Sequence, residues 1–152
     1  MEELGELMAL VTDGVLRRWR VARAHRRLAA GKAVRLPCSA RSDRPGRRPG
    51  YVNGTLGITP GAATACFRAR GADPLELPVG GTFHEPEPDT WHDQDWAATA
   101  YRPPGGGEPV YLQVDSRCLP MVRSALAGPK PRQKVRADRF RQPAGMRQTD
   151  VP

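Results

Sequence analysis

The chain has 152 residues, a hydrophobic content of 39% and a formal net charge of +8 at pH 7. This length fits one domain, and no segment approaches the roughly 18 consecutive apolar residues of a membrane-spanning helix. The first residues are acidic, which is the wrong sign for a signal peptide. We therefore expect a cytoplasmic protein, or a peripheral one at the inner face of the membrane.

The charge is sorted into blocks along the chain. Residues 1–32 carry a net charge of +3, residues 33–50 of +4, residues 51–118 of −5 and residues 119–152 of +6. An acidic middle therefore has a basic arm on each side. The arms could reach an anionic partner, or they could fold back on the middle and neutralise it.

Residues 1–31 are predicted to form an amphipathic helix whose second half is basic. One apolar stripe recurs at helical spacing and consists of Leu4, Leu7, Met8, Val11, Val15, Trp19 and Ala22. Gly31 has the residue type expected just past a helix C-terminus. The segment 12–14, Thr-Asp-Gly, is a weak point that could split this helix in two.

Seven short strand-like runs follow, and then one helix. The runs alternate in polarity or are bounded by turn signals, and they cover residues 34–38, 51–58, 63–70, 75–79, 82–84, 96–101 and 110–114. The segment 41–50 is rich in Pro, Gly and Arg and is predicted to be a mobile loop. Asp115 or Ser116 could cap the final helix, over 116–127, whose apolar side is Met121, Val122, Ala125 and Leu126.

This order predicts a mainly β fold with flanking helices, namely a seven-stranded PH-like small barrel closed by its C-terminal helix. The barrel would span 32–127 as two roughly orthogonal sheets, and a disordered basic tail would span 128–152. One shared core is expected, made of Leu56, Ile58, Phe67, Leu75, Leu77, Val110, Leu112, Val122 and Leu126.

Two short segments carry a resemblance to a known family. YVNGTLGITPG at 51–61 resembles the G-x-L-x-Ile strand and turn of bacterial PH-like domains, and RLPCSAR at 35–41 resembles the first strand of an uncharacterised actinobacterial PH-like family. In that family a membrane-spanning helix and an Arg run precede the barrel, whereas the helix here is too polar to span. The resemblance covers residues 1–127. It implies a fold and an interaction role, with no catalytic residues and no cofactor.

Other candidate sites have ordinary structural explanations. The segment 84–95, HEPEPDTWHDQD, is rich in possible ligands but matches no known metal spacing, so we expect a solvated acidic loop or an intramolecular partner for the basic arms. Cys38, Cys66 and Cys118 are predicted to be small buried side chains. Asn53-Gly54 is interpreted as a turn or bulge, and Trp91 and Trp96 as barrel-rim packing rather than a base-stacking platform.

The basic helix is the main candidate site. Its second half could contact an anionic surface through Arg17, Arg18, Trp19, Arg20, Arg23, Arg26 and Arg27. The alternative is an ordinary helix whose apolar stripe packs on the barrel. We expect a non-enzymatic module that binds a protein partner or an anionic membrane. A second hypothesis is non-specific nucleic-acid binding through the helix and the tail.

Overall fold

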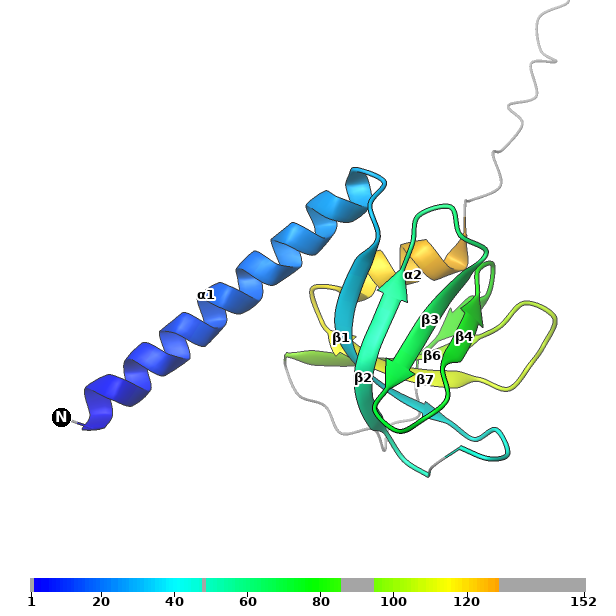
Figure 1. Ribbon diagram of the computed structural model, residues 1–152, viewed down its shortest axis with the longest axis horizontal. Helices are drawn as coiled ribbons and strands as arrows, with labels where there is room; N and C mark the ends of the chain where they lie inside the picture. The colour runs from blue at the N-terminus through cyan, green and yellow to red at the C-terminus, as the bar shows by residue number, and fades with distance from the viewer. Residues whose placement is uncertain (1, 48, 86–94, 129–152) are drawn as a thin grey trace, which may run out of the picture.

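The structure is a computed structural model that describes residues 2–47, 49–85 and 95–128, with side chains described from residue 14 onward. A long helix leads into seven strands and a short final helix (Figure 1). In chain order the elements are α1 (Glu2–Ala29), β1 (Val34–Ser42), β2 (Val52–Ile58), β3 (Thr64–Ala69), β4 (Leu75–Pro78), β5 (Thr82–His84), β6 (Trp96–Arg102), β7 (Val110–Asp115) and α2 (Leu119–Ala127).

The seven strands form one antiparallel sheet that curls into a half-barrel. Their order is β4-β3-β2-β1-β7-β6-β5, so β1 lies at the centre. Residues 34–40 of β1 pair with β2, and residues 38–42 pair with β7. Two sheets were expected, but a single strand shared by both halves joins them into one. The seven strands and the two flanking helices were predicted correctly.

The core fills the inner face of this half-barrel. All nine predicted core residues are buried, and Leu56, Leu77, Val110, Leu112, Val122 and Leu126 have no exposed surface. Tyr101, which is not among the nine predicted core residues, is also fully buried. Its hydroxyl donates a hydrogen bond to the Pro78 carbonyl and so ties β6 to the end of β4. Without that acceptor, the buried hydroxyl of Tyr101 would lose the hydrogen bond that it makes with water in the unfolded chain.

Two predicted boundaries are wrong by three residues or more. Strand β1 runs on to Ser42, beyond the predicted end at 38, because its last residues have β7 as a partner. Helix α2 starts at Leu119, and its N-cap is Cys118, which makes no side-chain capping bond. Asp115 ends β7 instead, and its Oδ1 accepts a 2.9 Å hydrogen bond from the Arg117 amide. Asp115 therefore shapes the turn before the helix and does not cap it.

Gly54 lies inside β2, so the predicted turn or bulge at Asn53-Gly54 is wrong. Gly54 pairs with Cys38 on one side and Ala69 on the other. A Cβ atom at this position would lie 2.7 Å from the Phe67 ring and 2.3 Å from the Arg68 carbonyl oxygen. Glycine is therefore used here for close approach of a ring and a neighbouring strand.

Helix α1 is continuous through the predicted weak point at residues 12–14. It ends as predicted at Gly31, which has a φ of 71°. The Gly31 amide donates to the Leu28 carbonyl at 3.0 Å, and the Lys32 amide donates to the Arg27 carbonyl at 2.9 Å. This is the hydrogen-bond pattern of a Schellman motif. Beyond this turn the chain enters β1 directly, while the other end of α1 projects away from the strands (Figure 1).

Candidate interaction surface on the first helix

One face of α1 docks on the half-barrel. This docked face consists of Arg17, Val21, Ala24 and Leu28, which share one side of a helix by their spacing. Ala24 is buried in the core cluster, and Val21 and Leu28 pack against it half-buried. The docking area is small and lies at the C-terminal half of the helix.

Arg17 anchors the docked face through charge. Its guanidinium donates to the Asp115 carboxylate and to both the carboxylate and the backbone carbonyl of Asp95. The Arg17 side chain is 26% exposed and that of Asp115 is 15% exposed, so the pair is partly shielded from water. These hydrogen bonds raise the pKa of Arg17 above its ordinary value, and the hydrogen bond from Arg17 lowers the pKa of Asp95. Both shifts favour the charged pair.

Two weaker contacts support the same junction. The His25 Nε2 atom lies 3.4 Å from the Arg117 carbonyl oxygen, at the turn before α2. The Arg27 Nε atom donates to the Ala33 carbonyl at 3.2 Å, across the Gly31 turn. Together they join the end of α1 to the start of β1 and to the turn after β7.

The opposite side of the helix is the outer face, formed by Val15, Trp19, Ala22 and Arg26. All four side chains are exposed, Val15 by 59% and Trp19 by 51%. This face contains the C-terminal part of the predicted apolar stripe, so the alternative that this part packs on the barrel is wrong. The Arg23 guanidinium lies over the Trp19 ring, 5.2 Å from its centroid, in a cation–π contact.

A groove of about 980 Å³ opens between α1 and the sheet. We call the helix side of it the groove face, formed by Arg20, Arg23 and Arg27. The barrel side includes Arg35, Pro37 and Trp96, and Trp96 is 36% exposed. Trp96 opens β6 and pairs with Asp115 of β7, which places the indole beside the Arg17 anchor. The groove is therefore basic and carries an accessible aromatic ring.

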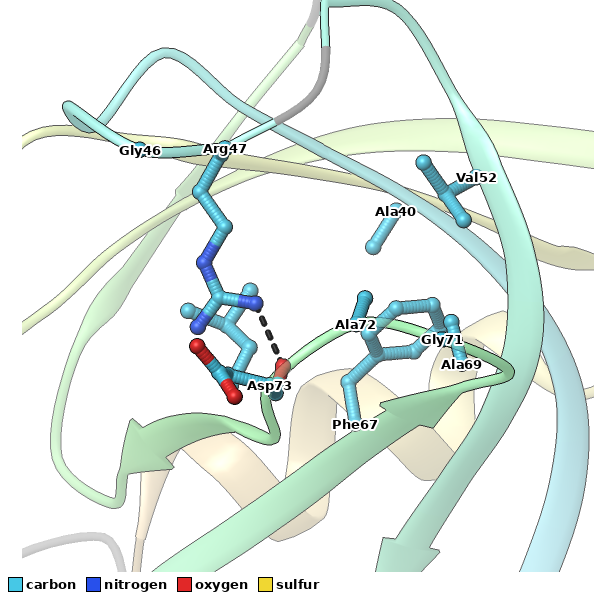
Figure 2. Close-up of a pocket in the computed structure, with 10 residues that line it drawn as sticks. Ala40, Gly46, Arg47, Val52, Phe67, Ala69, Gly71, Ala72 and Asp73 are labelled. Carbon is cyan, nitrogen blue, oxygen red and sulfur yellow. Dashed lines mark hydrogen bonds between the residues drawn. The ribbon is translucent and has the colours of Figure 1, made fainter.

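A second cavity, of about 460 Å³, lies at the β1–β2 end of the half-barrel. Figure 2 shows Ala40, Val52 and Phe67 as its apolar lining, with Arg47 extending across the opening. The Arg47 guanidinium donates to the Asp73 and Pro74 carbonyls at 2.5 and 3.0 Å. Through these two hydrogen bonds, Arg47 links the β1–β2 loop to the β3–β4 loop.

The seven predicted contact residues are divided among different faces of α1. Arg17 is engaged in holding the helix to the barrel. Trp19 and Arg26 lie on the outer face, and Arg18 is exposed beside that face. Arg20, Arg23 and Arg27 lie on the groove face. The anchoring role of Arg17 was not predicted from the sequence. Its spacing to Val21, Ala24 and Leu28 places it on one face with three apolar side chains, but no pattern in the sequence identifies its carboxylate partners.

The remaining predictions have mixed outcomes. Cys38 and Cys118 are buried as expected, and burial raises their pKa values to about 12 and about 11. Cys66 is only half-buried. Trp91 and residues 86–94 of the acidic segment lie outside the described residues, as does the predicted tail from residue 129. Within the described part of the chain, no group of three or more His, Cys, Asp or Glu side chains could hold a metal ion.

The chain was compared with protein-family models, with curated proteins and with solved structures, and none of the three comparisons finds a match. The surface of α1 must therefore be interpreted from its own geometry. No helix in the described ranges has a stretch long and apolar enough to cross a membrane.

Proposed function

We propose that this chain is a non-catalytic, PH-like interaction module that lies on an anionic membrane surface through the outer face of α1. The observation that carries the proposal is the exposure of Val15 and Trp19 on a helix already held to the barrel by its other side. A helix that used its apolar stripe for docking would have nothing left to insert. This helix docks through Arg17 and the apolar side chains of the docked face, which leaves Val15 and Trp19 of the stripe exposed.

The chemistry of the outer face suits a membrane interface. Trp prefers the boundary between headgroups and acyl chains, because its ring is apolar and its N–H is polar. Arg18, Arg23 and Arg26 lie on or beside this face and are exposed. A basic side chain near an anionic leaflet contributes about 1 kcal/mol. The apolar stripe also continues toward the N-terminus in the sequence, at Leu4, Leu7, Met8 and Val11.

The PH-like assignment rests on topology and on the sequence resemblance. Seven antiparallel strands curl into a half-barrel, and Val122 and Leu126 of the following helix are buried in its core. This is the arrangement expected of such a barrel. In this proposal the barrel is a scaffold that holds α1 at its C-terminal end and leaves its N-terminal end projecting (Figure 1).

The test is Trp19 fluorescence in a background where Trp91 and Trp96 are replaced by Phe. Vesicles of phosphatidylcholine with 30% phosphatidylserine should shift the emission to the blue, and vesicles of phosphatidylcholine alone should not. The shift should weaken from low to physiological salt, because surface charge is screened.

A matched pair of variants separates insertion from simple charge attraction. Val15→Glu and Leu16→Glu add the same charge at neighbouring exposed positions, but only Val15 lies on the outer face. Val15→Glu should weaken vesicle binding much more than Leu16→Glu. Equal effects would mean that binding depends on charge alone. If the emission shows no blue shift under any condition, the outer face does not bind membranes, and a protein partner becomes the remaining explanation for its exposure.

A further inference from the structure

The groove between α1 and the sheet has a different character from the outer face. Among the described residues that line it, five are Arg and one, Asp115, carries a carboxylate, which Arg17 already engages. Arg17 is hydrogen-bonded to Asp95 as well. The remaining four guanidinium groups, from Arg20, Arg23, Arg27 and Arg35, are exposed, and none of them is paired with a carboxylate among the described residues that line the groove, so this lining is strongly positive.

The aromatic content of the groove narrows the class of anion. Trp96 is 36% exposed and lies on the barrel wall of the groove, while Trp19 stands at its edge on the helix side. Grooves that combine a track of positive charge with exposed aromatic rings bind single-stranded nucleic acid, because the charge follows the phosphates and the rings stack on the bases. One face of Trp19 is covered by Arg23, so Trp96 is the ring available for stacking.

The shape of the groove favours a single strand over a duplex. Its basic residues face inward, between a helix and a sheet, and so cannot enter a major groove as a recognition helix does. A flexible strand can instead enter the space of about 980 Å³ and place its bases against the wall. We propose that this groove is a binding site for a short stretch of single-stranded nucleic acid, with Trp96 as the stacking ring and Arg20, Arg27 and Arg35 as phosphate contacts.

This site differs from the outer face in the residues that carry it, although Trp19 and Arg23 border both surfaces. It uses the groove face of α1 together with β1 and β6, and it requires α1 to remain docked. Variants at Val15 should therefore leave it unchanged, and variants at Trp96 should leave vesicle binding unchanged. Each proposal can fail without the other.

The direct test is fluorescence anisotropy of a fluorescein-labelled dT15 oligonucleotide with the full chain, over a series of salt concentrations. The logarithm of the affinity should fall linearly with the logarithm of salt concentration, with a slope of about −2 to −3 from three or four phosphate contacts. Trp96→Ala should weaken binding about fivefold to a hundredfold, the range for loss of one stacked base. Trp96→Phe should restore most of it.

A charge-matched control tests whether the groove or the overall positive charge is responsible. Arg35→Gln removes a groove side chain, whereas Arg68→Gln removes an equally charged, exposed side chain of β3 outside the groove. Arg35→Gln should make the slope shallower by about 0.7 and Arg68→Gln should change it little. Circular dichroism and thermal melting of each variant confirm that it is folded.

Three results would overturn the proposal. Equal changes in slope from Arg35→Gln and Arg68→Gln would mean diffuse attraction, with no site. Unchanged affinity in a folded Trp96→Ala variant would show that Trp96 does not stack on a base. Competition by a poly-glutamate peptide as strong as that by unlabelled dT15 would assign the groove to acidic peptides. A duplex of the same length should compete more weakly than dT15.

Discussion

In the half-barrel, large side chains such as Leu77, Leu112 and Tyr101 have no exposed surface. In the described part of α1, Ala24 alone is buried, and the helix is held by two half-buried apolar side chains and the Arg17 ion pairs. Apolar burial stabilises the barrel cooperatively, whereas the helix depends on a few contacts that water and salt can weaken. The helix should therefore undock from the barrel at a lower free energy than the one needed to unfold the barrel.

The largest expected difference comes from the same substitution made in each region. Leu112→Ala removes a fully buried side chain of β7 and should lower the free energy of unfolding by about 2–5 kcal/mol. Leu16→Ala changes a side chain of α1 that is 45% exposed and should have an effect within about 0.5 kcal/mol. Urea denaturation measures both. A loss of stability for Leu16→Ala as large as that for Leu112→Ala would contradict the exposed position of Leu16.

A smaller effect should come from crowding two strands of the barrel. Gly54→Ala would place a methyl group 2.3 Å from the Arg68 carbonyl oxygen, and relieving that overlap should cost about 1–3 kcal/mol. Gly57→Ala is the control in the same strand, since its Cβ would lie an ordinary 3.5 Å from the Cys66 carbonyl oxygen. The thermal midpoint should fall only for Gly54→Ala. An equal fall in the thermal midpoint of Gly57→Ala would mean that the loss comes from replacing a flexible glycine and is not caused by the close spacing of the strands at Gly54.

The smallest expected effect is local. Arg17→Ala removes the anchor of the docked face and should destabilise docking by about 1 kcal/mol, the value for a charged hydrogen bond reduced by exposure to water. Hydrogen exchange should speed up in α1 while the strands keep their protection. Arg18→Ala is the control, because Arg18 is exposed. Faster exchange throughout the strands would show that the helix and the barrel open together.

Docking should also depend on pH through Asp95. The hydrogen bond from Arg17 lowers the pKa of Asp95 in the folded state. Its contribution is therefore present above the unfolded value of about 3.9 and is lost as the pH falls through the lower folded value. The exchange rates of α1 amides, corrected for intrinsic rates, should rise below about pH 4, before the strands lose protection. In Arg17→Ala this additional rise should be absent.

Much of the barrel could be predicted from the sequence, because alternation along a strand directly marks the buried face. The core positions in β2, β3 and β7 follow from this rule. The end of α1 at Gly31 follows from a different one, the preference for glycine just past a helix C-terminus. The length of β1 could not be predicted. Its last residues form a strand because they pair with β7, which is distant in the sequence. Turn residues near Asp115 suggested a cap, but the carboxylate is used by Arg17 and by a turn amide.

The candidate site shows where hydrophobic pattern reasoning failed. The described part of the strongest apolar stripe of α1 lies on its outer face, whereas the docked face begins with an arginine and contains a small alanine. Periodicity shows which side of a helix is most apolar, and it carries no information about a carboxylate supplied by a distant part of the chain. The anchor therefore needed the positions of Asp95 and Asp115 in space. The predicted contact between the arginines of this helix and an anionic partner stays a prediction.

The position of β1 between the two halves of the sheet has a consequence for the order of folding. The strands β1 to β4 are consecutive neighbours, so they can pair by successive hairpins as soon as they are available. Pairing of β1 with β7 joins opposite ends of the folded module and must wait for a long loop to close. We therefore expect the β1–β4 hairpins to form early and the β1–β7 closure to limit the rate. Until that closure, one edge of β1 is an open template for pairing with another chain.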